Sequence, residues 1–473
     1  MRRRLALVGL VASLIATSVL AQSAKDATPR PAEVFSAWTR PTFPAAEYAA
    51  RRKGALAQLK PGEVWLVPGA EGTSAGETFR QLDNFEYFVG LELPRSLLVM
   101  DQSTGLSTLF TPARDPRFEN PLRPNDFPGR ALSADPFLRE SSGVDRVESD
   151  AGLATFLEAL IRGGARVRID LGSGANSSMA SPSIFETPPP GALLATHLKA
   201  RFPGVIIEDA NELVARLRMV KSEREIAAMR RAAQATSEAI VRGAAHVRGG
   251  VDERSLTGAF IADCMSLGSQ RPAFTPIIKS GENSLWPWRI LGAHYGRRNR
   301  MLRDGEMVIY DVGCEVDHYV SDVGRTFPVS SSFTPRQRGL VEMVRRISDA
   351  VIRAAKPGLT LPDLQAIADR EIPTAAKPYM QAPLYFGHHI GLDAGDPSIA
   401  EAPLQPGMIF TIEPWYYNHD EGVAVFIEDE ILITAKGCEN LTASLPRDAA
   451  SLEKLRRADR RLVPSRIPEE RRP

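Results

Sequence analysis

The residues Met307–Val329, MVIYDVGCEVDHYVSDVGRTFPV, decide the fold of the C-terminal half of this chain. An apolar run leads to Asp311, and a second strand-like run that begins near His318 carries Asp322. A turn at Val316–Asp317 predicts a β-hairpin in which Asp311 lies opposite Asp322. Directly opposed residues have Cβ atoms about 4.5–5.5 Å apart, and two carboxylates that close repel unless a cation or a shared proton separates them. Two unrelated aspartates at the edges of a turn are the alternative, and this stretch alone leaves it open.

A second pair of carboxylates follows the same pattern. Phe410–Pro414 and Val423–Glu428 flank the turn-like residues Asn418–Gly422. Centring the turn on its middle residues places Glu413 opposite Glu428. Each glutamate interrupts an apolar run, where a charged group is unfavourable unless it is paired or bound to a metal. The recurrence of the pattern favours metal binding for both pairs.

A histidine pair in a glycine-framed turn, Gly387–Gly391, lies between the two hairpins. Four carboxylates and one imidazole can hold two divalent cations, whose four positive charges balance the four carboxylates. This oxygen-rich set suits Mn²⁺ or Co²⁺ better than a structural thiolate-type zinc site. We therefore expect two divalent ions as cofactors, Mn²⁺ first, with Co²⁺ or Zn²⁺ as alternatives.

These motifs resemble the pita-bread metallopeptidases, the family of creatinase, aminopeptidase P, prolidase and methionine aminopeptidase. The likeness lies in Asp311-X-Gly, a second aspartate eleven residues later, the Gly-His turn, and the sequences TIEP and IEDE. Xaa-Pro aminopeptidase is the member that the chain resembles most. The resemblance implies five metal ligands: Asp311, Asp322, His388, Glu413 and Glu428.

The resemblance also implies roles for residues around the metals. A hydroxide bridging the two ions attacks the peptide carbonyl, while Glu413 takes the water proton and passes it to the leaving nitrogen. His294, seventeen residues before Asp311 and followed by Tyr295, matches a substrate-side catalytic histidine of the family. An ordinary loop histidine is the alternative there. Tyr417 matches a tyrosine that braces the metal ligands.

Three positions depart from the family pattern. Gly395 replaces a histidine that contacts substrate, Phe426 replaces an arginine beside the last metal glutamate, and Leu384 replaces a further histidine. Strand parity points His389 away from the side that His388 faces, so His389 does not fill the gap. These departures predict slow turnover of prolyl peptides or a different substrate.

The N-terminal half predicts an α/β domain because strand-like runs such as Val64–Val67 alternate with helical patterns such as Leu153–Ile161. The segments Thr78–Gln81 and Asn84–Gly90 resemble the N-terminal domain of aminopeptidase P and creatinase relatives. An unrelated α/β domain is the alternative. The expected fold class is therefore an α/β N-terminal domain followed by an α+β pita-bread domain with a curved, mostly antiparallel sheet.

The predicted domains follow from these patterns. Residues 1–21 are expected to be a signal peptide, 22–40 a lead-in, 41–215 the N-terminal domain, 216–446 the catalytic domain and 447–473 a basic tail. The catalytic domain opens with a capping box at Ser222 and Glu225, and we expect further helices at 252–265 and 335–355.

The first 21 residues join three arginines to the apolar run Leu5–Leu20 and end on Val19–Ala21. The run is shorter than the roughly 20 residues that a membrane span needs, so a cleaved signal is favoured over an anchor. We therefore expect a periplasmic or secreted protein with no stable membrane insertion after cleavage. The net charge of +1 gives no indication of nucleic-acid binding.

Three cysteines, Cys264, Cys314 and Cys438, allow at most one disulfide, and we expect buried, unreactive thiols. Cys314 is an odd number of residues from Asp311 on the same strand, so it points to the opposite face and is a poor metal ligand.

The sequence therefore predicts an exported dinuclear aminopeptidase that hydrolyses the N-terminal Xaa-Pro bond of peptides. The resemblance further implies a homodimer or homotetramer. The alternatives are a prolidase-type dipeptidase, an organophosphate hydrolase, and a catalytically weak pita-bread binding module.

Overall fold

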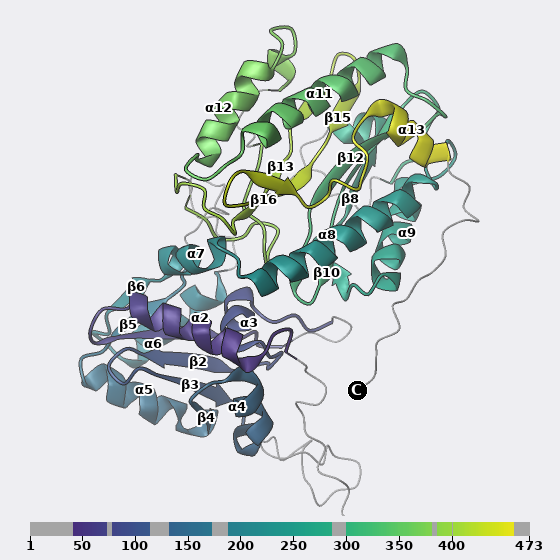
Figure 1. Ribbon diagram of the computed structural model, residues 1–473. Helices are drawn as coiled ribbons and strands as arrows, with labels where there is room; N and C mark the ends of the chain where they lie inside the picture. Colours follow the sequence, from purple (N-terminus) through teal and green to yellow (C-terminus); the bar gives the residue numbers. More distant parts are fainter. Residues whose placement is uncertain are drawn as a thin grey trace, which may run out of the picture. The chain divides into compact units, whose positions relative to one another are not determined.

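The computed structural model describes residues 41–72, 78–113, 132–172, 188–285, 299–380, 386–399 and 401–457 (Figure 1). The chain divides into two compact units. One comprises residues up to 167 together with 202–206, and the other comprises 168–201 and the residues from 207 onward. The predicted signal peptide and lead-in lie outside the described residues. None of the described helices is long and apolar enough to cross a membrane.

The first sheet is mixed and has the strand order β4-β3-β2-β1-β5-β6. The antiparallel neighbours β1, β2 and β3 are followed by the parallel pair β3 and β4, as expected of an α/β layer. Its strands are β1 (Glu63–Pro68), β2 (Leu97–Asp101), β3 (Leu106–Thr111), β4 (Arg146–Ser149), β5 (Arg166–Ile169) and β6 (Ile207–Asp209). The α-helices described before residue 211 are α2 (Ala45–Gln58), α3 (Asp83–Val89), α4 (Pro136–Ser142), α5 (Leu153–Arg162) and α6 (Pro190–Arg201).

The second half begins after α7 (Asn211–Met219) with the long helix α8 (Glu223–Ala244). The predicted capping box is present, because Ser222 and Glu225 each bond the other's backbone N–H. Two further helices, α9 (Glu253–Ser266) and α11 (Pro335–Ala354), agree with the prediction to within one residue at each end. The described residues also form the α-helices α12 (Leu361–Glu371) and α13 (Ala449–Arg457), and α13 occupies the start of the predicted basic tail.

The site residues lie in or next to short antiparallel sheets. The sheets have the orders β11-β10-β7, β12-β9-β8, β13-β16-β17 and β14-β15. Their strands are β7 (Arg271–Pro272), β8 (Ile277–Ser280), β9 (Met307–Val312), β10 (Cys314–Val316), β11 (Tyr319–Val320), β12 (Val323–Pro328), β13 (Ile409–Ile412), β14 (Trp415–Asn418), β15 (Val423–Phe426), β16 (Asp429–Ile433) and β17 (Cys438–Asn440). In Figure 1 α8, α9 and α11 are drawn around these strands. Their apolar residues form one large core with residues of the helices. The fold-class prediction is thus confirmed for both halves.

The register of the first hairpin corrects one prediction. Val316 pairs with Tyr319, and Asp311 pairs with Gly324, so Asp311 does not lie opposite Asp322. The turn contains Asp317 and His318, whose φ angles of 53° and 67° lie in the left-handed region. Aspartate and histidine adopt this conformation more readily than most residues, which allows a turn one residue later than predicted. The shift is two residues in register, so Asp322 keeps the face of Asp311 and becomes its diagonal neighbour.

The register of the second hairpin is as predicted. Ile412 pairs with Asp429, and Trp415 pairs with Phe426, with the same register on both sides of the break. Glu413 and Glu428 therefore lie across from each other where the β13–β16 ladder gives way to the β14–β15 ladder.

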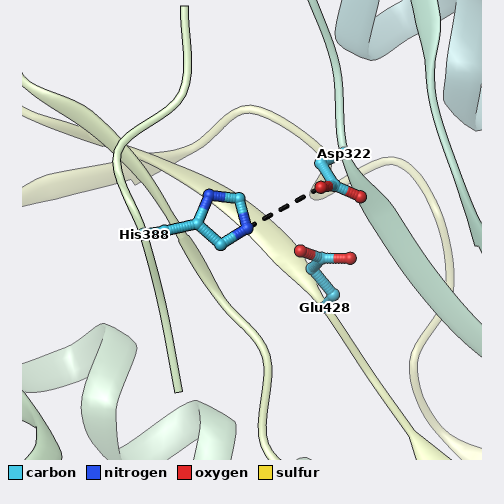
Figure 2. Close-up of side chains that lie close together, drawn as sticks. All are labelled: Asp322, His388 and Glu428. Carbon is cyan, nitrogen blue, oxygen red and sulfur yellow. Dashed lines mark ion pairs between the residues drawn. The ribbon is translucent and has the colours of Figure 1, made fainter. Parts of the chain in front are cut away.

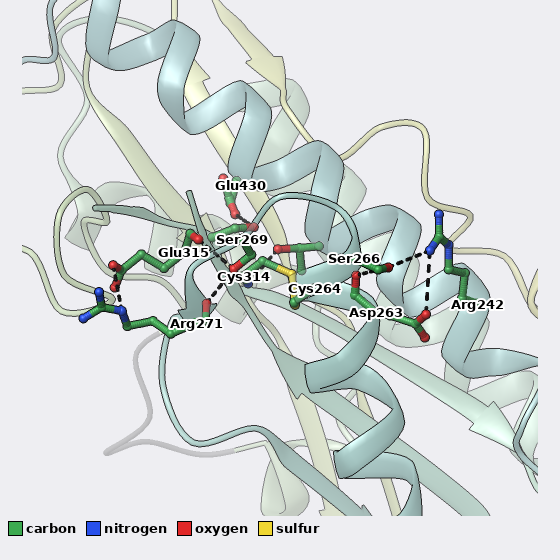
Figure 3. The surroundings of a disulfide bond; sticks show 11 residues. Arg242, Asp263, Cys264, Ser266, Ser269, Arg271, Cys314, Glu315 and Glu430 are labelled. Carbon is green, nitrogen blue, oxygen red and sulfur yellow. Dashed lines mark hydrogen bonds and ion pairs between the residues drawn. A yellow bond between two sulfur atoms is a disulfide. The ribbon is translucent and has the colours of Figure 1, made fainter. Parts of the chain in front are cut away.

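The cysteine prediction is wrong for two residues. Cys264 on α9 and Cys314 on β10 form a disulfide, with their Cα atoms 5.6 Å apart (Figure 3). Cys438 remains a half-buried free thiol. Fifty residues separate the bonded pair, and the contact depends on α9 packing beside β10, which sequence spacing does not reveal. Cys314 is bonded to Cys264 on α9 and is not part of the group of metal-ligand side chains, which agrees with the prediction from strand parity.

Candidate metal centre

The five predicted metal ligands come from two hairpins and one loop of the second half. Asp311 lies near the end of β9, and Asp322 directly precedes β12. His388 lies in the loop before β13, Glu413 directly follows β13, and Glu428 separates β15 from β16. Each ligand except His388 thus stands at or near a strand end, where the ladder holds its backbone.

Three of these side chains already form a compact group. One ligand atom from each of Asp322, His388 and Glu428 lies within 4.8 Å of the other two, and Figure 2 shows the imidazole facing both carboxylates. His388 Nε2 is 3.7 Å from Asp322 Oδ2 and 3.2 Å from Glu413 Oε1. The structure therefore brings Asp322, His388, Glu413 and Glu428 together. Asp311 borders them as the diagonal neighbour of Asp322 in the hairpin, and its charge raises the pKa of both Asp322 and Glu428.

Gly313 explains the glycine in the Asp-X-Gly motif. A Cβ at this position would lie 1.7 Å from the carbonyl oxygen of Ser321, which is impossible without moving one strand. The missing side chain lets the residue before Asp322 come against the strand that carries Asp311. The glycine thus sets the separation of the two aspartates.

Thr411 organises the histidine side of the site. The backbone N–H of His388 donates to Thr411 Oγ1 at 3.2 Å. The backbone N–H of Thr411 donates to the carbonyl of His388 at 2.8 Å. The Thr411 hydroxyl in turn donates to Glu413 Oε1 at 3.1 Å. One threonine therefore ties the histidine loop to the carboxylate that follows β13.

Two buried residues that sequence reasoning missed hold the opposite side. Glu430 accepts hydrogen bonds from the Ser321 hydroxyl and, at 2.8 Å, from the backbone N–H of Asp322. Arg325, fully buried, donates to Asp429 Oδ1 at 2.7 Å and to the carbonyl of Glu428. These contacts fix the backbone at Asp322 and Glu428. Glu430 was visible only as part of the IEDE sequence, which gives no indication of its partner.

The electrostatics of the site are those of a concentrated negative charge. Burial raises the pKa of Asp311 to about 7 and that of Glu413 to about 8. Burial and neighbouring carboxylates also raise the pKa of Asp322 and Glu428. Desolvation by the surrounding protein lowers the pKa of His388, although 38% of its side chain is exposed, and this favours the neutral imidazole.

The donor set fits divalent metal ions. Asp322 Oδ1 and Glu428 Oε2 are buried without a hydrogen-bond partner among the described residues. An unpaired buried carboxylate oxygen is costly in free energy, and a bound cation removes the penalty. Neutral imidazole and carboxylate oxygens are the forms in which these groups bind metals.

The other predicted site residues are placed less completely. His294 and Leu384 lie outside the described residues. Tyr417 lies near the site, since burial and the charges of Asp311 and Glu413 raise its pKa, and its hydroxyl accepts a hydrogen bond from Lys279 at 3.3 Å.

The remaining departures lie beside the site. Gly395 is exposed, next to the buried Asp396. Phe426 packs with Ile309 and Ala424 in a small apolar cluster. His389 is buried and packs against Phe410 rather than among the carboxylates, in agreement with strand parity.

An α/β domain, followed by antiparallel hairpins that gather carboxylates around a histidine, defines a metal-dependent hydrolase of the pita-bread fold. Comparison with known proteins agrees with this class. The family model described as metallopeptidase family M24 matches residues 227–435, and the aminopeptidase P N-terminal domain matches residues 48–168.

Individual relatives match over most of their length. The Xaa-Pro aminopeptidase of Escherichia coli is 30% identical over 453 residues, covering 88% of this chain and 98% of the relative. The mitochondrial intermediate cleaving peptidase 55 of Arabidopsis thaliana is 27% identical, covering 86% of this chain and 82% of the relative. An E. coli aminopeptidase P variant solved in complex with substrate superposes with a TM-score of 0.73 at 27% identity, covering 88% of this chain and 98% of that one. The chain therefore belongs to metallopeptidase family M24, among the aminopeptidase P proteins.

Proposed function

We propose that this metallopeptidase removes the N-terminal residue ahead of proline from peptides, using two divalent ions, Mn²⁺ first. The single observation that carries the proposal is the convergence of Asp322, His388, Glu413 and Glu428, with Asp311 beside them. The relatives named for Xaa-Pro cleavage support the choice of substrate. Four carboxylates meeting at one point serve no evident purpose in a binding module.

The chain's own residues supply positioning and proton transfer. Asp311, Asp322, His388, Glu413 and Glu428 would hold the ions, which when bound supply Lewis-acid polarisation and an activated water. Glu413 accepts the proton of the attacking water and delivers it to the leaving nitrogen. The hydrogen bond from Thr411 orients the Glu413 carboxylate for this work. The side chain of His388 is 38% exposed, so a peptide can reach the site from solvent.

We further propose that the enzyme works outside the cytosol, in the periplasm or as a secreted protein. The predicted signal peptide is the first support. The Cys264–Cys314 disulfide is the second, because structural disulfides persist mainly in oxidising compartments. Sequencing the N-terminus of protein recovered from an exporting host tests this, with Gln22 as the expected first residue. An intact Met1 in an exported fraction would contradict cleavage. The proposed homodimer or homotetramer is checked by light scattering on the same material.

The substrate proposal is tested with one panel of compounds. The metal-free protein is loaded with Mn²⁺ and assayed on an Xaa-Pro-Xaa peptide, its Xaa-Ala-Xaa counterpart, an Xaa-Pro dipeptide and a phosphotriester. We expect release of the first residue from the Pro peptide, and metal analysis showing two ions per chain. Cleavage of the dipeptide alone would identify a prolidase, and of the phosphotriester alone an organophosphate hydrolase. A protein that hydrolyses none of them would be a binding module.

A further inference from the structure

Lys279 is a buried cation beside the carboxylate site, and the reaction described above gives it no role. The residue lies on β8 and is only 3% exposed. Lysine is seldom so deeply buried unless its charge is matched.

Sheet register places Lys279 on the same face as Asp311. In the β8–β9 pair, Ile277 lies opposite Asp311 and Lys279 lies opposite Ile309. Opposed residues share a face, and residues two apart along a strand share it as well. Burial lowers the pKa of Lys279, while the neighbouring charges of Asp311 and Glu253 favour its ammonium form. Glu253, however, is already hydrogen-bonded by Ser280 and Asn283.

Tyr417 connects Lys279 to the rest of the site. The ammonium donates to the Tyr417 hydroxyl at 3.3 Å and lies 5.5 Å from the centre of its ring. Tyr417 itself is close enough to Asp311 and Glu413 for their charges to raise its pKa. The positive charge of Lys279 thus stands at the Asp311 end of the site. The compact group of Asp322, His388 and Glu428 does not include Asp311.

We propose that Lys279 weakens the metal position that includes Asp311, so that the two ions bind with unequal affinity. The ammonium of Lys279 reduces the net charge of the site from four negative, for the four carboxylates alone, to three negative. One divalent ion then leaves a single negative charge, where the four carboxylates without Lys279 would leave two, so the second ion is attracted less strongly. Charge interactions between neighbouring buried groups remain strong inside a protein. The inference rests on the proposed dinuclear function and deepens it.

The same residue is expected to stabilise the metal-free protein. Without metal, the charge of Lys279 offsets carboxylate repulsion at Asp311, whose pKa it lowers. It therefore holds the site together until the second ion arrives. Removing its charge should lower the stability of the metal-free chain and increase the stabilisation that metal gives.

The test is a Mn²⁺ titration of metal-free protein, followed by calorimetry and by the electron paramagnetic resonance signal of free Mn²⁺. Native protein is compared with Lys279→Met, which removes the charge, and Lys279→Arg, which keeps it. Lys356→Met, at an exposed lysine, is the matched control. In Lys279→Met we expect the second ion to bind at least about tenfold tighter relative to the first. Lys279→Arg and Lys356→Met should keep the native ratio of the two dissociation constants.

Thermal unfolding of the same proteins supplies a second readout. The metal-free Lys279→Met protein should unfold at a lower temperature than native, and saturating Mn²⁺ should raise its Tm by more. If that variant does not fold, Lys279→Gln keeps an N–H donor near Tyr417 without the charge.

The outcomes separate this inference from the function on which it rests. One ion in both native and charge-removed protein at every Mn²⁺ concentration overturns the dinuclear function and this inference with it. If Lys279→Met binds two ions and the ratio of their dissociation constants is the same as in native protein or larger, the proposed role of Lys279 is wrong and the dinuclear function stands.

Discussion

His388 Nε2 lies 3.2 Å from Oε1 of Glu413, and Thr411 is hydrogen-bonded to both residues. The histidine loop and the end of β13 are therefore held together by protein contacts as well as by any metal. The histidine side of the site is pre-organised, so metal ions need not assemble it. The carboxylates instead repel one another until an ion arrives.

Replacing Asp322 with asparagine should remove one ion per chain and abolish hydrolysis. The neutral amide is a weaker ligand, and the change leaves Glu430 still bonded to the backbone of residue 322. Metal analysis and peptide assay of Asp322→Asn are the measurements. Asp420→Asn, an exposed aspartate in the β14–β15 turn, is the control and should behave as native. Two ions and full activity in Asp322→Asn would refute its role as a ligand.

Metal-free protein should lose stability as pH rises. The pKa of Asp311 is raised from 3.8 to about 7 and that of Glu413 from 4.5 to about 8, so between these values the folded chain binds more protons than the unfolded chain. The free energy of unfolding then falls with increasing pH, by up to about 1.4 kcal/mol per pH unit for each such carboxyl. Urea unfolding between pH 5 and pH 8 measures it.

Saturating Mn²⁺ should remove or reverse this pH dependence, because metal binding releases the protons. Stability of the chelated protein that stays level or increases over the same pH range would contradict the raised pKa values.

Gly395→His should raise the rate on Xaa-Pro peptides if the missing imidazole limits turnover. A donor aimed at the developing charge of the reaction typically contributes about 10²–10³ in rate. Gly395 is exposed and donates its N–H to Asp393 Oδ1 at 2.8 Å, so a side chain can be added at the surface of the loop. The kcat of native and variant protein with Mn²⁺ supplied is the measurement. If native protein is as fast as its relatives and Gly395→His is no faster, the missing histidine does not limit turnover.

Removing the disulfide should lower the free energy of unfolding by about 4 kcal/mol, the value expected for closing a loop of this length. The double variant Cys264→Ala/Cys314→Ala should match native protein treated with reductant in denaturant. Cys438→Ala keeps the disulfide and should keep the native response to reductant. Equal unfolding curves for native and double variant would contradict a stabilising bond.

Gly324→Ala should destabilise the fold and disturb Glu428. A Cβ at Gly324 would lie 2.3 Å from Cε1 of Phe426 and 2.9 Å from Cβ of Glu428. Overpacking of this kind costs about 1–3 kcal/mol. Phe426→Ala in the same chain removes the nearer clash, so the double variant should lose less stability than the two single changes combined. Strict additivity in chemical denaturation would show that the two residues are not in contact.

The sequence predicted the hairpins because strand parity is a local property. Predicting that Glu413 faces Glu428 required only the centre of the turn and the two-residue period of a β-strand. The first hairpin was misplaced because Asp317 and His318 adopt left-handed φ angles without glycine, so the turn lacked its usual signature. Each aspartate still lies on the predicted face of the sheet because the error in register is an even number of residues.

The residues that sequence reasoning missed depend on contacts between distant strands. Lys279 is buried near Asp311 only because β8 pairs with β9 in one particular register. Arg325 and Glu430 reach backbone groups of a different hairpin. The pairing of Cys264 with Cys314 depends on how α9 packs. No spacing rule within a single segment contains that information.

The shared register of the β13–β16 and β14–β15 ladders makes the outer hairpin an adjustable module. Adding the same number of residues to β14 and to β15 lengthens the arm and leaves Glu413 facing Glu428. A single residue inserted into only one of the two strands would instead shift the register and move the side chains of that strand to the opposite face. For loop grafting or library design, the exposed residues 419–422 are therefore the natural joining point.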